Sequence, residues 1–316
     1  MYNKNTVKPM TKRIFALGFF DGVHLGHQAL LRECCKLAAQ LNMQTAAITF
    51  ETHPQALFVE TVPPLLTSAA DRQWLLGCYG MEDVYQFPVT EAVMTMPWQA
   101  FLEELLEFGA AGFVCGYDFR FGYRGQGNAE KLAAFCRERG LPCVIVPEQD
   151  LDGIRISSTY IRRQLETGDM ATAVRFLGHP HIFTEKVVPG HQLGRKLGFP
   201  TANLHLPEGI AVPKFGVYAC VALVDGKRYP AVANIGTRPT VSGTGITVEP
   251  WILDYTGDLY GREITLEFYR FLRPEMKFDS LADLQAEIFR NADQAREILK
   301  ELSQATPCAE GKNVVK

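Results

Sequence analysis

The chain has 316 residues, 47% apolar and 21% charged, which is typical of a globular protein, and its length favours about two domains. A formal net charge of −3 argues against a nucleic-acid partner held by bulk positive charge. The N-terminal segment lacks the apolar core of a signal peptide and no run of about 18 apolar residues could span a membrane, so we expect a cytoplasmic location.

Short apolar runs alternate with amphipathic segments through the first half of the chain. The runs are typical of buried strands, and the segments between them carry apolar residues at helical spacing. This alternation predicts an α/β domain with a parallel, doubly wound sheet, whose ligands bind beyond the carboxyl ends of the strands. The predicted strands are 14–18, 45–50, 83–87, 112–116 and 142–147, and the predicted helices are 26–41, 68–79, 97–107 and 129–139.

From about residue 182 strands follow one another without helices between them. The tripeptide Asp225–Lys227 is a hairpin signal, and closely spaced strands favour an antiparallel barrel or sandwich. A terminal helix, 280–302, opens with Ser280 as its N-cap. The predicted strands are 218–224, 228–236, 246–255 and 263–272, and the predicted domains are 1–180 and 181–316.

The stretch GFFDGVHLGHQALL, residues 18–31, places two histidines at the start of a predicted helix. Free N–H groups and partial positive charge at a helix N-terminus attract anions, and Gly18 and Gly26 allow close backbone approach. His24 and His27 could donate hydrogen bonds to a phosphate and, when protonated, neutralise charge that develops on it. The alternative is that one histidine caps the helix and the other packs.

Two further segments, TFETHPQALF (49–58) and GYDFRFGYRGQGN (116–128), each follow a predicted strand and should lie at the same edge of the sheet. In the second, Phe119 and its aromatic neighbours could stack on a flat ring that Asp118 hydrogen-bonds. A flexible glycine loop whose aromatic residues pack into the core is an equally good interpretation.

Residues 155–165, RISSTYIRRQL, carry hydroxyls and arginines at a helix start. Arg155 and Arg162 suit a triphosphate, because guanidinium groups bind phosphate oxygens through two hydrogen bonds. Ser158 and Thr159 would add donors, although hydroxyls at this place can serve only as N-caps.

In the second half, LGRKLGFPTANL (193–204) is the most specific string. Thr201 and Asn203 are two apart in an extended segment and project to one side, where their oxygens suit Mg²⁺. Gly198 allows close approach and Arg195 adds positive charge. An ordinary turn at PTAN is the alternative.

Glu249 lies within an apolar predicted strand beside Trp251 and is a candidate general base. The alternative is a glutamate on the solvent face of a half-buried strand. NIGTRPT, which contains Asn234, and LRPEMKF, which contains Arg273, add a turn and cationic groups.

These motifs resemble one known family along almost the whole chain. The pattern GxFDGxHxGH is similar to the HxGH nucleotidyltransferases, which are Rossmann-like, and the series PTAN, GVY, NIGxRPT, VE, LYG and LRxExKF resembles the riboflavin kinase module, a six-stranded barrel with a terminal helix. Together they resemble the prokaryotic bifunctional riboflavin kinases/FMN adenylyltransferases, also called FAD synthetases. The resemblance implies phosphorylation of riboflavin to FMN and adenylylation of FMN to FAD, with ATP as co-substrate and Mg²⁺ as cofactor.

The resemblance also implies roles for individual residues. It makes Glu249, His24, His27 and Arg155 catalytic, with Glu249 deprotonating the ribityl hydroxyl of riboflavin, and Thr201 and Asn203 metal ligands. Nucleotide or flavin binding falls to Gly18, Phe19, Asp21, Gly26, His53, Asp118, Phe119, Ser158, Thr159, Arg162, Arg195, Gly198, Asn234 and Arg273.

The chain departs from the family pattern at Thr52, Glu185 and Trp251, where Pro, Gly and His are usual. Two alternatives therefore stay open: only the adenylyltransferase half is active, or the protein binds flavin without turnover. We expect small-molecule substrates, no nucleic-acid or membrane partner, and a monomer or weak homo-oligomer.

Overall fold

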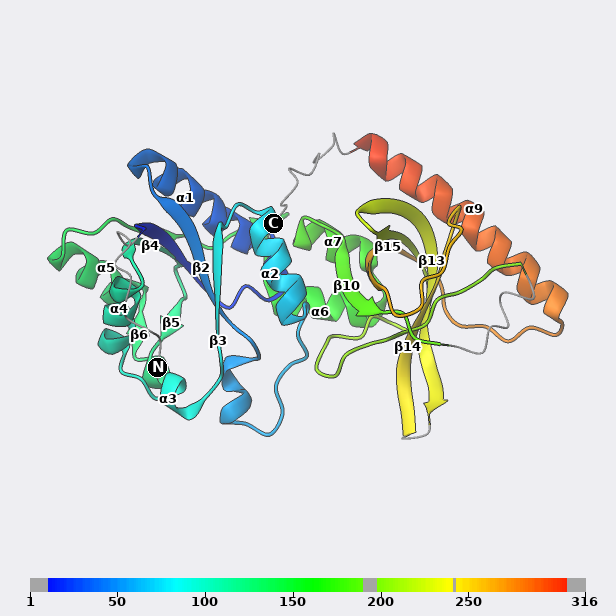
Figure 1. Cartoon of the computed structure of the whole chain (residues 1–316), viewed down its shortest axis with the longest axis horizontal. Coiled ribbons are helices and arrows are strands. Elements are labelled where there is room, and N and C mark those ends of the chain that lie inside the picture. The colour runs from blue at the N-terminus through cyan, green and yellow to red at the C-terminus, as the bar shows by residue number, and fades with distance from the viewer. Residues whose placement is uncertain (1–10, 190–197, 241–242, 306–316) are drawn as a thin grey trace. The chain divides into compact units, whose positions relative to one another are not determined.

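The computed structural model describes residues 11–189, 198–240 and 243–305, and their contacts divide the chain into two compact units (Figure 1). The first contains residues 11–63 and Arg72–Ile156, and the second contains Pro64–Asp71 and the described residues from 157 onward. The domain ranges 1–180 and 181–316 remain a prediction. Among the described residues, no helix combines the length and apolar character needed to cross a bilayer.

The first unit is built on a five-stranded parallel sheet with the order β3-β2-β1-β4-β7, which confirms the predicted doubly wound sheet. The chain leaves β1 toward β2 on one side and later adds β4 on the other, so the switch point lies between β1 and β4. The strands are β1 (Arg13–Leu17), β2 (Gln44–Phe50), β3 (Asp83–Phe87), β4 (Ala110–Gly116) and β7 (Cys143–Val146).

Local capping fixes where the helices of this unit begin and end. Asn42 adopts φ 53° after α1, and its N–H donates to the carbonyls of Ala38 and Ala39. Asn128 begins α5 by accepting the Lys131 N–H at 2.9 Å. The helices are α1 (Leu25–Leu41), α2 (Ala69–Cys78), α3 (Glu91–Met94), α4 (Trp98–Glu107) and α5 (Ala129–Glu138), with short 3₁₀ turns η1 (Asp21–Val23), η2 (Pro54–Leu57) and η3 (Tyr123–Gly125). Two small hairpins pair β5 (Arg120–Phe121) with β6 (Gly127–Asn128) and β8 (Asp150–Leu151) with β9 (Ile154–Arg155).

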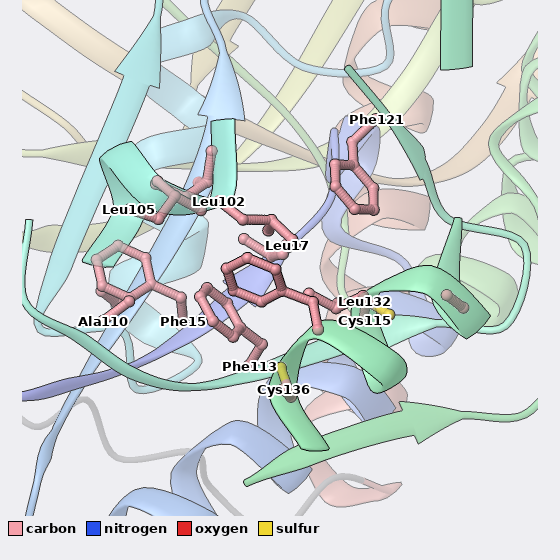
Figure 2. Close-up of a cluster of buried hydrophobic side chains, with 14 residues drawn as sticks. Phe15, Leu17, Leu102, Leu105, Ala110, Phe113, Cys115, Phe121, Leu132 and Cys136 are labelled. Carbon is pink, nitrogen blue, oxygen red and sulfur yellow. The ribbon is translucent and has the colours of Figure 1, made fainter. Parts of the chain in front are cut away.

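A buried apolar cluster joins the central strands to α4 and α5 (Figure 2). Phe15 of β1 and Phe113 of β4 have ring centroids 6.5 Å apart, and both side chains are fully buried. Leu102 from α4 and Leu132 from α5 complete the contact. Burial of apolar area at about 25 cal/mol per Å² stabilises this side of the sheet and holds β1 beside β4.

The second unit is a six-stranded antiparallel sheet with the order β10-β15-β12-β13-β14-β11. A bridge between Val188, after β10, and Asn203, before β11, brings the two ends together, with the Val188 N–H donating to the Asn203 carbonyl at 2.9 Å. The sheet is therefore a near-barrel, as predicted, with few exposed edges. The strands are β10 (His181–Lys186), β11 (Leu204–His205), β12 (Gly216–Val224), β13 (Lys227–Thr240), β14 (Gly243–Ile252) and β15 (Glu263–Arg273).

Turns and helices complete this unit. Asp225 and Gly226 adopt φ 50° and 76°, and this left-handed pair forms the predicted tight hairpin between β12 and β13. The strand predicted over 246–255 ends at Ile252, because Asp254 turns the chain at φ 61°. Ser280 accepts the Asp283 N–H at 3.1 Å and caps the terminal helix as predicted. The helices are α6 (Ser158–Thr167), α7 (Met170–Leu177) and α9 (Leu281–Ala305).

Candidate active sites

The histidine pair lies where β1 ends and α1 begins. The connecting backbone is strained: Phe20 and Val23 adopt φ 58° and 39°, values that side chains rarely allow. This turn makes His24 the N-cap of α1, where its Nδ1 accepts the His27 N–H at 3.3 Å. The imidazole rings stack with centroids 3.6 Å apart and planes 11° from parallel. His24 therefore caps the helix, and both rings lie at the carboxyl edge of the sheet, whereas phosphate binding by the pair remains a prediction.

The environment of His27 disfavours a proton on its ring. Burial, then His24, then Arg72 lower the pKa of His27 well below its ordinary value of 6.5. The ring is neutral near pH 7, so it can donate one N–H bond to a phosphate but adds no charge of its own.

Side chains pack closely against two glycines around the pair. A Cβ at Gly18 would lie 2.9 Å from the Phe20 ring, and a Cβ at Gly26 would lie 3.3 Å from two atoms of the His24 ring. Asp21 is 2% exposed within η1. These residues, all predicted from the motif, are brought together at one edge of the sheet.

A pocket of about 610 Å³ opens at the carboxyl ends of β1, β2 and β4. Its walls are mainly apolar, and its volume is in the range of small-molecule sites. Phe119 lines it and stacks on Phe121 at 5.3 Å, while Phe121 is 7% exposed and belongs to the core. Within the aromatic loop, Phe119 therefore lies in the pocket wall and Phe121 packs into the core. The other lining residues are Gly18, Phe19, Ile48, Phe50, Pro54, Gln55, Phe58, Val59, Val93, Met94, Phe101, Asp118, Arg120, Gly122, Arg124 and Gly125.

His53 lies beside this edge, next to the exposed Thr52. Its Nδ1 accepts the Gln55 N–H at 3.2 Å and caps η2, and its ring meets Phe19 edge-on at 5.5 Å. The turn therefore forms without proline at position 52.

Arg155 is held by two carboxylates in this structure. Its Nη2 lies 2.7 Å from Asp118 Oδ2, and its Nε lies 3.2 Å from Glu148 Oε2. All three side chains are about half exposed, so these pairs are weak and exchangeable. Both Arg155 and Asp118 were predicted site residues, and sequence reasoning missed the contact between them.

The remaining predicted residues of this motif, Ser158, Thr159 and Arg162, belong to the second unit as the first turns of α6. The N-cap is Ser157, which accepts the Tyr160 N–H at 3.3 Å. Arg162 donates to Thr159 Oγ1 at 3.5 Å.

In the second unit, strand register gathers the predicted kinase residues on one face. Thr201 is bridged to Trp251 and Leu204 pairs with Val248, so in this register Asn203 lies opposite Glu249. On its other side Glu249 faces Asn234 of β13. Residues directly opposite, or two apart, point to the same face of a sheet.

Polar side chains lie on and beside the sheet face that carries Glu249. Thr247 Oγ1 donates to Glu249 Oε1 at 3.4 Å, and Asn234 Nδ2 donates to Glu275 Oε1 at 3.4 Å. A Cβ at Gly236 would overlap the Glu275 carboxylate. Glu275 is thus a second acidic residue beside this face. Its motif, LRPEMKF, was singled out for its cationic groups alone, so the carboxylate was missed.

Arg273 is paired with side chains of the terminal helix in this structure. Its side chain is 13% exposed, and its Nε lies 3.1 Å from Glu287 Oε1 and 3.0 Å from Asn291 Oδ1 of α9. Burial lowers the pKa of Arg273, and Glu287 opposes that shift. The pair ties the end of β15 to the terminal helix.

The other predicted residues of the kinase half are placed as follows. Gly198 adopts φ 85°, which favours glycine, whereas Arg195 lies outside the described residues. Trp251 packs edge-on against Phe289 of α9 at 5.3 Å. Glu185 is half-buried in β10.

Comparison with known proteins matches both halves. The riboflavin kinase family model matches residues 177–299, and the FAD synthetase model matches residues 7–160. Bifunctional riboflavin kinase/FMN adenylyltransferases from Listeria monocytogenes and Escherichia coli are 33% and 36% identical, over 92% of this chain and 93% of each relative. The crystal structure of a macrolide-efflux protein from Streptococcus pneumoniae is 29% identical, with a TM-score of 0.81 over 93% of this chain and 96% of that one. The chain belongs to the family of bifunctional riboflavin kinases/FMN adenylyltransferases.

Proposed function

We propose that this protein makes FAD from riboflavin in two steps. The second unit phosphorylates riboflavin to FMN with MgATP, and the first unit transfers AMP from ATP to FMN with release of pyrophosphate. One observation carries the proposal: the histidine pair at the sheet edge of the first unit lies within the matched FAD synthetase region, and Thr201, Asn203 and Glu249 on one sheet face of the second unit lie within the matched riboflavin kinase region.

In the kinase step, Glu249 takes the proton of the terminal ribityl hydroxyl, and the hydroxyl oxygen attacks the γ-phosphorus of ATP as ADP leaves. Thr201, Asn203 and Glu249 share one face and offer hydroxyl, amide and carboxylate oxygens, a donor set that fits Mg²⁺. Bound there by Thr201 and Asn203, Mg²⁺ would neutralise phosphate charge. Arg195, Gly198 and Asn234 bind nucleotide or flavin, and Arg273, at the end of β15 and paired with Glu287 of α9, supports the site.

In the adenylyl transfer, a phosphate oxygen of FMN attacks the α-phosphorus of ATP and pyrophosphate leaves. His24 and His27 direct ring N–H groups at the phosphate oxygens, where hydrogen bonds strengthen as charge develops. Arg155 reaches the phosphates by leaving its two exposed carboxylate partners. Contacts to nucleotide and flavin come from Gly18, Phe19, Asp21, Gly26, His53, Asp118 and Phe119. Nucleotide or flavin binding by Ser158, Thr159 and Arg162 remains a prediction.

The apolar pocket supports the flavin half of this assignment. Its volume of about 610 Å³ suits a flat tricyclic ring, and both Phe119 and Asp118 line it. A cytoplasmic location, a monomer or weak homo-oligomer, and the absence of nucleic-acid and membrane partners remain predictions.

The test is to incubate purified protein with riboflavin, ATP and Mg²⁺ and to separate the flavins by chromatography. We expect FMN and then FAD. Glu249→Gln should lose riboflavin phosphorylation by about 100-fold or more and still convert FMN to FAD, and His27→Asn should do the reverse. If the protein converts FMN to FAD but does not phosphorylate riboflavin, only the adenylyltransferase half is active. If it binds flavin and converts none, it is a flavin-binding protein without turnover.

A further inference from the structure

Arg72, near the start of α2, is the largest fully buried side chain in the described part of the chain, with 0% exposure. It belongs to none of the motifs that carry the family resemblance. A guanidinium remains ionised in proteins, and burying it costs free energy unless hydrogen bonds and opposite charge compensate. The burial of Arg72 therefore needs a structural explanation.

Its contacts join two strand ends at the candidate adenylyltransferase site. Nη2 donates to the carbonyl of Phe50, the last residue of β2, and to that of Glu51 at 3.4 Å. The guanidinium carbon lies 4.8 Å from the centroid of the Phe19 ring, which follows β1. Thr49 Oγ1 donates to the Phe19 carbonyl at 2.6 Å and reinforces this junction. Arg72 thus braces the carboxyl ends of β1 and β2 from behind the pocket.

Charge at Arg72 is only partly compensated. Burial lowers its pKa, and Asp21 is the carboxylate that opposes this shift. Within the described residues, Nε and Nη1 are buried without a hydrogen-bond partner. Two guanidinium nitrogens with unused N–H groups therefore remain in the interior.

The same charge acts on His27. The groups that face this ring are His24, stacked at 3.6 Å, the Phe20 ring, edge-on at 5.3 Å, and Arg72 across the junction. His24 and Arg72 both disfavour a proton on His27, and burial adds to their effect. The buried Nδ1 of His27 has no hydrogen-bond partner in the described structure that would favour the charged form.

We propose that Arg72 is a positioning residue of the adenylyltransferase site, which holds the ends of β1 and β2 together and places its charge near the histidine pair. It acts through Phe19, Phe50 and His27 and does not itself contact substrate. The inference rests on the proposed adenylyl transfer for its kinetic consequence, but its effect on His27 can be measured without turnover.

The experiment compares Arg72→Met, Arg72→Gln and Arg72→Lys in the full chain. Arg13→Met is the matched control, because Arg13 pairs with Asp83 at the opposite end of the same sheet, at 2.6 Å. Two readouts are taken: the pH dependence of kcat/KM for FAD formed from FMN, and the NMR titration of the His27 ring, assigned with His27→Asn. Riboflavin phosphorylation, assigned to the second unit, serves as an internal control for the amount of intact protein.

We expect Arg72→Met and Arg72→Gln to lose about tenfold or more in kcat/KM at pH 7, since small displacements of catalytic groups are costly. In both variants the His27 titration, and the acidic limb of the rate profile, should move to higher pH. Arg72→Lys, which keeps the charge, should restore the titration and much of the rate. Arg13→Met should change neither.

A wild-type His27 titration in Arg72→Gln would overturn the proposal and leave Arg72 a structural residue. The Gln variant keeps an N–H donor for Phe50, so it provides this answer even if Arg72→Met does not fold. If the wild-type protein forms no FAD, the proposed function fails, whereas the NMR titration still decides the role of Arg72.

Discussion

Replacing Gly26 with alanine separates the geometry of the histidine pair from the stability of the helix that carries it. The new Cβ would lie 3.3 Å from both Cε1 and Nδ1 of His24, slightly inside ordinary van der Waals contact. His24 must yield by a few tenths of an ångström, and it is already stacked on His27 at 3.6 Å. Moving one ring therefore disturbs the other.

Two effects of opposite sign follow. Alanine favours a helix over glycine by up to about 1 kcal/mol, so the free energy of unfolding should stay the same or rise. Displacement of the imidazoles should lower kcat/KM for FAD formation by about tenfold, which corresponds to ~1.4 kcal/mol in the transition state. The prediction is an enzyme that is no less stable and yet slower in one of its two steps.

The assay is the rate of FAD formation from FMN and ATP, measured beside riboflavin phosphorylation and denaturant unfolding. Gly77→Ala is the matched control, because Gly77 lies within α2 and a Cβ there meets nothing within 4 Å. That variant should gain the helix stabilisation without losing rate. Unchanged FAD formation in Gly26→Ala would refute the close-packed pair as the reason for glycine at this position.

Three further changes test other parts of the structure. Phe113→Ala should destabilise the first unit by about 3–5 kcal/mol in urea unfolding, because the ring is fully buried between β1, α4 and α5; a cost below about 1 kcal/mol would contradict this core. Asn203→Ala should raise the Mg²⁺ concentration for half-maximal riboflavin phosphorylation by about tenfold and leave FAD formation from FMN unchanged. If the Mg²⁺ concentration for half-maximal rate rose equally in both reactions, Asn203 would not be a residue of the kinase site. Burial, then His179, lower the pKa of His181 to about 4 in the folded protein, against 6.5 in the unfolded chain. Between pH 6.5 and 4 the unfolded chain therefore binds more protons than the folded protein, and about 3 kcal/mol of stability should be lost as the pH falls through that window. His181→Asn should flatten this pH dependence, and an unchanged slope would assign it to other groups.

The sequence alone determined the elements and much of the candidate chemistry. Periodicity located most of the strands and helices within a few residues, although α7 and β10 were not predicted. Turn residues such as Asp225 and Gly226 and the cap at Ser280 marked connections that depend on local backbone geometry. Strings such as GxFDGxHxGH and PTAN carried the family resemblance because several residue types at fixed spacing are far more specific than any one of them. These are short-range features, and neighbouring residues are sufficient to encode them.

Tertiary structure alone decided which residues share a site and in which charge state. Register across β11, β14 and β13 set Glu249 between Asn203 and Asn234, and the approach of Glu275 and the capture of Arg273 by Glu287 depend on segments distant in sequence. Burial of Arg72 could not be inferred from its sequence neighbours, since it arises where β1, β2 and α2 meet. The lowered pKa of His27 follows first from its own burial and then from His24 and Arg72, because desolvation and nearby charge are properties of the folded interior.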